Sequence, residues 1–188
     1  MILYRCFAWK KAARDDAPDG PLWFPRPFQG EGRHDNPDAY GCLYLADRAV
    51  SCVVEQLAPF RGQRLIAPLL RRRDLPLALA QIELNGDAAL LDLDDPSVLR
   101  RERLRPSQVA TRHRSVTQPQ ALDLYRRHPD AAGLRWWSAW EAIWANVTVF
   151  DRAAKALRLI DVTELTLDHP NLLEAAELFG LRVVERRV

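Results

Sequence analysis

Glu55 is a carboxylate whose position demands an explanation. It stands directly after Val54 in a stretch where Val50, Val53, Val54 and Leu57 recur with helical spacing, so it lies beside the apolar stripe of a predicted helix. A carboxylate in that place is costly to bury without partners. If it instead faces a cleft, its negative charge can stabilise a positive charge that develops on a substrate. The sequence leaves both interpretations open.

Two further side chains, Arg5 and Ser138, could also do chemistry. Arg5 lies within an aromatic and apolar run, residues 2–9, that predicts a buried strand. Because a guanidinium cannot give up its charge, it needs an anionic partner there, either in a structural salt bridge or as an anion bound in a cleft. Ser138 ends a second predicted strand, residues 133–138. Catalytic side chains often sit at strand ends, although a serine there is also commonplace.

The elements that must position Glu55 are contiguous with it in the chain. Residues 30–41 contain glycine, Asn-Pro and aspartate, which favour a loop. Residues 42–46 form a short apolar run that predicts a buried strand. Asp47 then has the side chain and position to cap the helix that carries Glu55.

Tryptophans are concentrated in the second half of the chain. Residues 136–144 hold four tryptophans within nine residues, and such rings line a core or a cleft that can stack a flat ligand. Residues 145–150 alternate as a strand, and Thr117 is placed to cap a helix that ends near His128. Strands and helices mix irregularly, which predicts an α+β fold with a mainly antiparallel or mixed sheet. We find no repeat or linker and expect one domain over residues 1–188.

The charge and cysteine content narrow the function classes. The 27 Lys and Arg nearly balance 25 Asp and Glu, which argues against a dedicated nucleic-acid binder. The arginine-rich residues 100–114 are best interpreted as a solvated face, with nucleic-acid binding as the alternative. Three cysteines without metal-ligand spacing predict no metal site and a reduced, cytoplasmic protein. No signal peptide or apolar run of membrane-spanning length is evident, so no membrane partner is expected.

Several short motifs follow one another in a fixed order along nearly the whole chain. They are Tyr4-Arg5, residues 30–33 followed by Asn36-Pro37, residues 44–47 followed by Glu55, Thr117-Gln118, residues 133–138, and residues 146–150. In this order and spacing the sequence resembles the RES-domain family, bacterial toxins that are paired with Xre-type antitoxins. Two positions depart from the family pattern. His34 stands where the loop usually has tryptophan, and Trp140 stands where a basic residue often follows the serine.

The resemblance implies a fold similar to the ADP-ribosyltransferases, with a split mixed or antiparallel sheet and flanking helices. It also implies a reaction in which NAD+ is a substrate rather than a prosthetic group. The nicotinamide–ribose bond is cleaved by a glycohydrolase or phosphorylase, and the loss of NAD+ arrests growth. One alternative is an ADP-ribosyltransferase that modifies a specific protein, and another is a non-catalytic binding module. The implied partner is an Xre-type antitoxin, and self-association as a homodimer is compatible with the aromatic content.

The resemblance and the residue chemistry together assign roles at the expected site. The catalytic set is Glu55, Tyr44, Arg5 and Ser138, and the set that contacts NAD+ is Arg5, Arg33, Tyr44 and Asn36. Glu55 would stabilise the oxocarbenium-like transition state, while Arg5 and Arg33 would clamp the diphosphate. Tyr44 would stack on nicotinamide, and Ser138 would bind the ribose or hold Glu55. No metal is needed for these roles.

Overall fold

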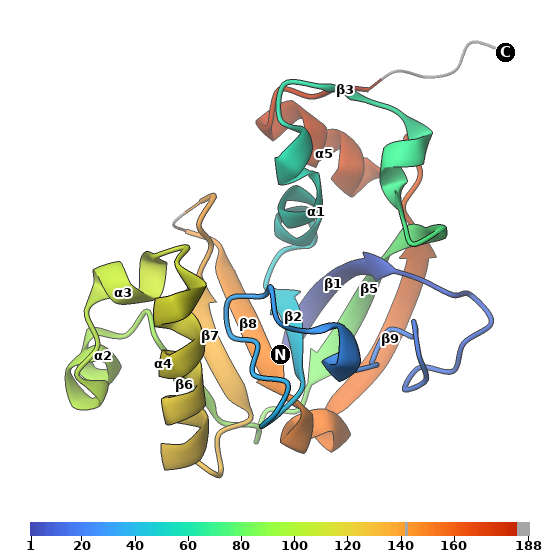
Figure 1. Ribbon diagram of the computed structural model, residues 1–188. Helices are drawn as coiled ribbons and strands as arrows, with labels where there is room; N and C mark the ends of the chain where they lie inside the picture. Colours follow the sequence, from blue (N-terminus) through green and yellow to red (C-terminus); the bar gives the residue numbers. More distant parts are fainter. Residues whose placement is uncertain (142, 184–188) are drawn as a thin grey trace, which may run out of the picture.

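The computed structural model describes residues 1–141 and 143–183 (Figure 1). Its main sheet has eight strands in the order β4-β5-β1-β2-β8-β7-β6, with β9 also paired to β5. These strands are β1 (Ile2–Ala8), β2 (Cys42–Ala46), β4 (Arg71–Arg72), β5 (Leu75–Leu84), β6 (Leu90–Asp92), β7 (Gly133–Trp137), β8 (Ala145–Phe150) and β9 (Leu157–Glu164). The neighbours are antiparallel except for β6 and β7, which are parallel. The predicted α+β class with a mixed sheet is confirmed.

Helices flank this sheet, and a small second sheet completes the fold. The α-helices are α1 (Ala49–Leu57), α2 (Pro96–Glu102), α3 (Pro106–Ala110), α4 (Arg114–Arg127) and α5 (Pro170–Leu178). Short 3-10 segments are η1 (Arg26–Phe28), η2 (Ala58–Phe60), η3 (Ala67–Leu70) and η4 (Asp151–Ala156). The second sheet pairs β3 (Arg64–Leu65) with β10 (Arg182–Val183) in parallel. None of the described helices is both long and apolar enough to cross a bilayer.

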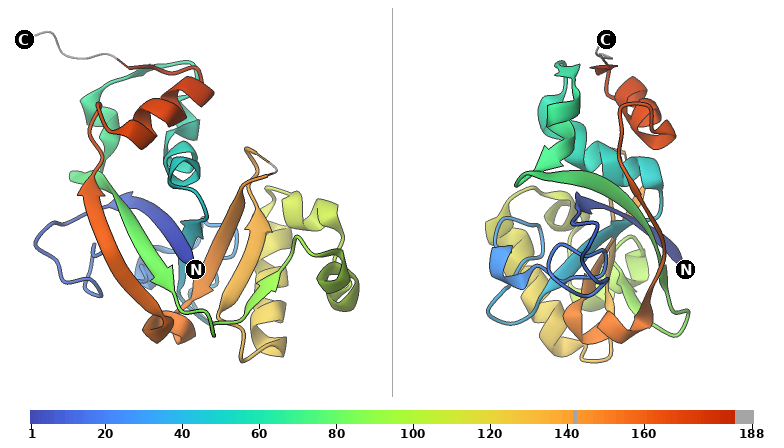
Figure 2. Two further views of the ribbon diagram at one scale, coloured as in Figure 1. Left: turned by 180° about the vertical axis from the view of Figure 1, so that it is seen from behind. Right: turned by 90° about the vertical axis from the view of Figure 1, so that its right-hand side faces the viewer.

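The main sheet is split between β1 and β2. A single residue pair, Tyr4 with Ala46, joins these two strands. In contrast, β1 pairs β5 along its whole length, and β2 pairs β8 along its whole length. We call β1, β4, β5 and β9 the first lobe and β2, β6, β7 and β8 the second lobe. Figure 1 and the rear view in Figure 2 show the lobes diverging on the side where α1 lies. The expected split sheet is confirmed.

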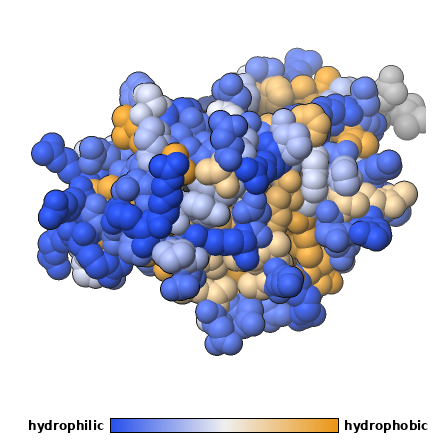
Figure 3. All heavy atoms as spheres, turned by 60° about the horizontal axis from the view of Figure 1, so that its bottom comes forward, coloured by the Kyte–Doolittle hydropathy of each residue, from blue (hydrophilic) through white to orange (hydrophobic). Residues whose placement is uncertain are grey.

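Three clusters of buried side chains hold the helices and loops on this sheet. One cluster joins α1 and α5 to the first lobe, through residues such as Val53, Leu57 and Leu172. A second lies on the other face of the sheet and includes Leu3 and Ile82. A third packs α2, α3 and α4 against β7 and β8. The molecular face in Figure 3 is mainly hydrophilic, with apolar residues visible in a band between the charged ones.

Two expected helix caps are wrong, and both residues bond elsewhere. The cap position of α1 is Arg48. Asp47 is bound to Ala145 instead: its backbone N–H donates to the Ala145 carbonyl at 3.0 Å, and its carboxylate accepts the Ala145 N–H at 3.2 Å. Helix α4 begins at Arg114, before the expected cap Thr117. Thr117 therefore lies inside the helix, and its buried hydroxyl donates to the Arg33 carbonyl in the loop that precedes β2.

Candidate active site

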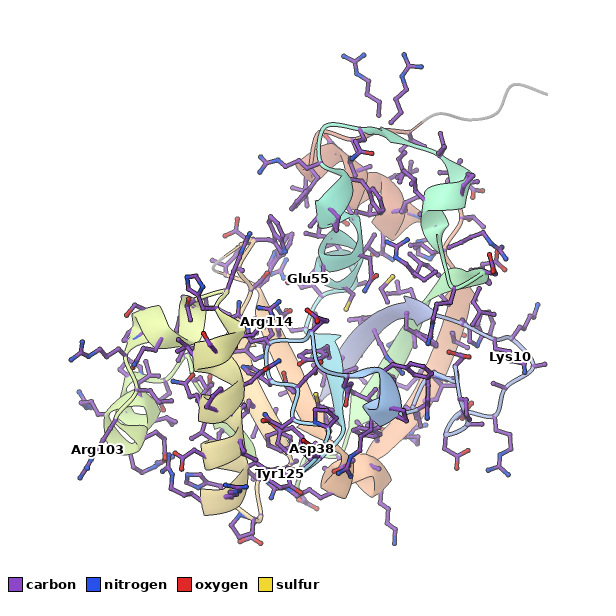
Figure 4. All side chains as sticks on the ribbon, in the orientation of Figure 1. Lys10, Asp38, Glu55, Arg103, Arg114 and Tyr125 are labelled. Atoms are coloured by element: carbon purple, nitrogen blue, oxygen red, sulfur yellow. The ribbon has the colours of Figure 1, made fainter. Side chains whose placement is uncertain are left out.

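A cleft of about 530 Å³ opens where the two lobes diverge. Its walls come from β1, β2, α1, the β7–β8 region, the loop before β2 and the segment that joins α3 to α4. This volume is typical of sites for small ligands. Figure 4 shows Glu55 at the lower end of α1, on the side of the cleft that faces Arg114 near the start of α4. The cleft therefore gathers side chains that are far apart in the sequence.

The carboxylate of Glu55 is exposed to this cleft and is held by three donors. Its Oε1 accepts hydrogen bonds from the Ser138 hydroxyl and the Asn146 amide, each at 3.3 Å. Its Oε2 accepts the indole N–H of Trp140 at 3.0 Å. These contacts orient the carboxylate. Of the two interpretations of Glu55, the structure supports the one in which the carboxylate faces a cleft.

Tyr44 forms part of the cleft wall and is fixed by the loop before β2. Its hydroxyl donates to Oδ1 of Asp35 at 2.7 Å and accepts the backbone N–H of His34 at 2.9 Å. Burial, reinforced by the negative charge of Asp35, raises the pKa of Tyr44 well above its usual value. Oδ2 of Asp35 accepts the N–H groups of Gly30 and Gly32 at 2.8 and 2.7 Å. Asp35 therefore ties the loop to the tyrosine hydroxyl.

Arg33 brings a permanent positive charge to the cleft. Its Nη1 donates to the carbonyls of Val109 and Thr111 at 2.7 and 2.6 Å, and its guanidinium lies 4.5 Å from the ring centre of Trp136. Burial, together with the nearby positive charge of Arg114, lowers the pKa of Arg33. An arginine keeps its charge despite such a shift. The side chain therefore adds a positive charge to the wall of the cleft.

The comparisons with known proteins identify the family. A family model described as the RES domain matches residues 2–169. The chain belongs to the RES-domain family. Its fold is similar to a chain in the crystal structure of the M. tuberculosis MbcT–MbcA toxin–antitoxin complex, with a TM-score of 0.63 and 22% identity over 95% of this chain and 88% of that chain. No curated protein matches the sequence.

His34, which was expected to depart from the family pattern, packs in the interior as a neutral side chain. Its Nδ1 lies 2.8 Å from the Thr148 hydroxyl, and its ring meets Trp136 edge-on at 5.3 Å. The Thr148 hydroxyl also accepts the indole N–H of Trp136 at 3.1 Å, so it donates its own proton to His34. Burial, with Arg33 nearby, lowers the pKa of His34 to about 3.

Arg5 and Asn36 are not among the residues that line the cleft of this RES domain. Arg5 is buried, but it has no anionic partner among the described residues. Its guanidinium donates to the carbonyls of Gly20 and Pro21 at 3.3 and 2.6 Å, so carbonyl dipoles take the place of the expected anion. Burial lowers the pKa of Arg5 to about 10, which leaves it charged. The amide of Asn36 donates to the His34 carbonyl and the Tyr40 hydroxyl within its own loop, and to the Gln118 carbonyl of α4.

The cleft lining includes functional side chains that were not among the predicted site residues, notably Arg112, Arg114, Trp140 and Asn146. Arg114 donates to the Glu31 carbonyl at 2.8 Å, and Arg112 lies 4.4 Å from the ring centre of Trp140. Both arginines belong to the basic segment that was interpreted as a solvated face. No spacing separates them from the other arginines there, so the sequence held no signal for them. For Trp140 the sequence held two hints: the tryptophan cluster that was expected to line a core or a cleft, and the expected departure from the family pattern.

The cleft of the RES domain offers anion-binding groups rather than metal ligands. Within residues 1–141 and 143–183, no group of three His, Cys, Asp or Glu side chains is arranged to hold a metal ion. The cleft lining includes one oriented carboxylate, three arginines and the side chain of Tyr44. Such a set can bind phosphate groups and stabilise a positive charge that forms between them and the carboxylate.

Proposed function

We propose that this RES domain is the toxin of a toxin–antitoxin pair and cleaves the nicotinamide–ribose bond of NAD+. The observation that carries the proposal is the Glu55 carboxylate, held by three donors in a cleft that also contains three arginines. The family membership and the fold shared with a toxin–antitoxin complex support the same conclusion.

The proposed reaction places Glu55 beside the ribose of NAD+. The carbon–nitrogen bond breaks, and neutral nicotinamide leaves with the bonding electrons. Positive charge then develops on the ribose as an oxocarbenium-like state, which an adjacent carboxylate stabilises. An acceptor oxygen from water, phosphate or a protein side chain forms the new bond to the ribose, and its proton passes to the surrounding solvent.

The other cleft residues bind the rest of the substrate in this proposal. Arg33, Arg112 and Arg114 contact the diphosphate, because guanidinium groups make charge-assisted hydrogen bonds to phosphate oxygens. The ring of Tyr44 packs against nicotinamide. Arg5, which was expected to share in catalysis, instead anchors the loop of residues 10–29 against the sheet through its two carbonyl partners.

The proposed partner is an Xre-type antitoxin that covers the cleft. An exposed carboxylate and cationic side chains would otherwise stay open to NAD+. Co-expression followed by affinity purification would test the pairing. Loss of growth arrest on co-expression, with both chains in one complex, is the expected result.

A nicotinamide-release assay tests the reaction and the site together. Purified protein is incubated with NAD+, with and without phosphate, and compared with Glu55→Gln and with the control Glu83→Gln. Glu83 is a half-exposed residue paired with Arg158, outside the cleft. We expect release by the wild type and the control and a loss of at least about 100-fold in Glu55→Gln. Absence of nicotinamide release by the wild type would refute the proposal.

The same assay identifies the acceptor. A requirement for phosphate indicates a phosphorylase, and turnover in its absence indicates a glycohydrolase. In a cell extract supplied with labelled NAD+, the appearance of label on one protein band indicates a protein ADP-ribosyltransferase. A salt-sensitive gel shift with nucleic acid, in a protein that leaves NAD+ intact, would favour the binding-module alternative.

A further inference from the structure

Trp140 is linked to the Glu55 carboxylate in two ways, once by a direct hydrogen bond and once through the Ser138 hydroxyl. We propose that Trp140 is a positioning residue for the reaction proposed above, on which this inference rests: its indole N–H and its backbone N–H together fix the carboxylate of Glu55. Trp140 itself need not touch the reacting atoms. Its position is one of the two departures from the family pattern.

The two routes close a ring of hydrogen bonds around the carboxylate. The indole N–H of Trp140 donates directly to Oε2 of Glu55 at 3.0 Å. The backbone N–H of Trp140 donates to the Ser138 hydroxyl at 3.1 Å, and that hydroxyl donates to Oε1 of Glu55 at 3.3 Å. One residue therefore restrains both carboxylate oxygens. Two restrained oxygens fix the plane of the carboxylate as well as its place.

Glu55 needs such restraint because it is exposed on one turn of α1. A glutamate side chain has several rotatable bonds, and an exposed one loses its preferred geometry unless it is hydrogen-bonded. Misplacement of a catalytic group by about 1 Å can cost about 100-fold in rate. The indole N–H is also the shortest of the three contacts to the carboxylate.

The Trp140 ring is held in turn by a row of side chains. The guanidinium of Arg112 lies 4.4 Å from its ring centre on one side. Phe179 meets it edge-on, with ring centres 5.4 Å apart, and the guanidinium of Arg61 lies 5.6 Å from the Phe179 ring. Arg112 belongs to the segment between α3 and α4, beside the second lobe, whereas Phe179 follows α5, which packs with α1 over the first lobe.

The row therefore links the helices of the two lobes through Trp140. Because Trp140 also holds Glu55, the row couples the orientation of the carboxylate to the distance between α5, over the first lobe, and the segment that joins α3 to α4, beside the second lobe. A purely structural role predicts a different outcome: loss of the indole N–H would leave turnover unchanged as long as an aromatic ring kept the packing. The two roles can be separated by removing the N–H alone.

Trp140→Phe is the test variant, because phenylalanine keeps a ring for Arg112 and Phe179 but has no N–H. The matched control is Trp23→Phe, since Trp23 meets Phe28 edge-on in the loop of residues 10–29, outside the cleft. Steady-state kinetics with NAD+ and the thermal midpoint are measured for both variants. We expect kcat of Trp140→Phe to fall by about 10- to 100-fold with KM within about 3-fold of wild type. The control should keep both values.

The outcomes distinguish this inference from the proposed function. A wild type that releases no nicotinamide refutes both. An active wild type whose kcat survives Trp140→Phe refutes the positioning role alone, as does a variant that changes KM without kcat. If Trp140→Phe fails to fold, benzothienylalanine at position 140 replaces only the N–H by sulfur and keeps the bicyclic ring. The same fall in kcat is then expected, and an unchanged kcat overturns the inference.

Discussion

Glu102 is a buried carboxylate whose removal should measurably destabilise the fold. It ends α2, and its side chain is 1% exposed. Its Oε1 accepts from Arg101 at 2.9 Å, while its Oε2 accepts from Arg127 and lies 3.0 Å from Nε2 of His128. Glu102→Gln keeps the size of the side chain but removes the charge that these three donors surround.

The size of the effect follows from the pKa of Glu102. Burial alone would raise this pKa, but the hydrogen bonds from His128, Arg101 and Arg127 outweigh it and lower the pKa from its usual 4.5 to about 2. A folded-state pKa below the unfolded value adds stability that is fully present above about pH 4.5 and is lost as the pH falls through about 2. The difference corresponds to about 3 kcal/mol of unfolding free energy.

Urea denaturation of wild type and Glu102→Gln from pH 7 to pH 2 checks this value. We expect a deficit of about 2–3 kcal/mol at pH 7 that narrows steadily between pH 5 and pH 2, because acid protonates the wild-type carboxylate. Glu83→Gln is the control, since its half-exposed pair with Arg158 contributes about 0–1 kcal/mol. If Glu102→Gln matches this control at pH 7, or if its deficit does not narrow in acid, the reasoning fails.

Two further substitutions test the packing and the loop of the cleft. Gly133→Ala would place a Cβ 2.1 Å from the backbone oxygen of Thr148 and force β7 away from β8. We expect the free energy of unfolding, measured by urea denaturation, to fall by about 3 kcal/mol or more. The control Gly86→Ala should lose none, because its new Cβ meets no atom within 4 Å. Asp35→Asn removes the charged acceptor of the Tyr44 hydroxyl. We expect the free energy of unfolding to fall by about 1–3 kcal/mol and NAD+ turnover to slow about 10-fold. Unchanged turnover would argue against a role for Asp35 in holding Tyr44 in the cleft.

Local patterns in the sequence predicted the elements that carry Glu55 and Ser138. The apolar run of residues 42–46 became β2, and the helical spacing around Glu55 became α1. The predicted strands at residues 133–138 and 145–150 became β7 and β8. Each of these signals lies within a few residues of the feature that it predicts, because a strand or helix is specified by its own side-chain period.

The placement of Arg5 could not be derived in the same way. Successive residues of a strand point to opposite faces, so whether Arg5 or its neighbour Cys6 meets the cleft depends on how β1 sits in the sheet. Cys6 lines the cleft, and Arg5 points to the loop carbonyls. The sequence marks both residues as part of one buried strand but does not say which face becomes a cleft.

The contacts that complete the site depend on chain segments far apart in sequence. Arg33 is held by the carbonyls of Val109 and Thr111, and Thr117 donates its hydroxyl to the Arg33 carbonyl at 2.6 Å. These bonds require both α3 and α4 to pack beside the loop. A basic residue in an arginine-rich segment therefore looks the same in the sequence whether it ends in solvent or, like Arg112, in the cleft.

The carboxylate of Asp35 has a consequence for how the cleft responds to solution conditions. It already accepts the backbone N–H groups of Gly30 and Gly32, so this small cradle of amides is filled by the protein's own anion. An anion that enters the cleft must be met by guanidinium groups such as Arg33, whose charge does not titrate between about pH 5 and pH 9. His34 stays neutral over the same range. Anion affinity should therefore vary little with pH and fall as salt is added.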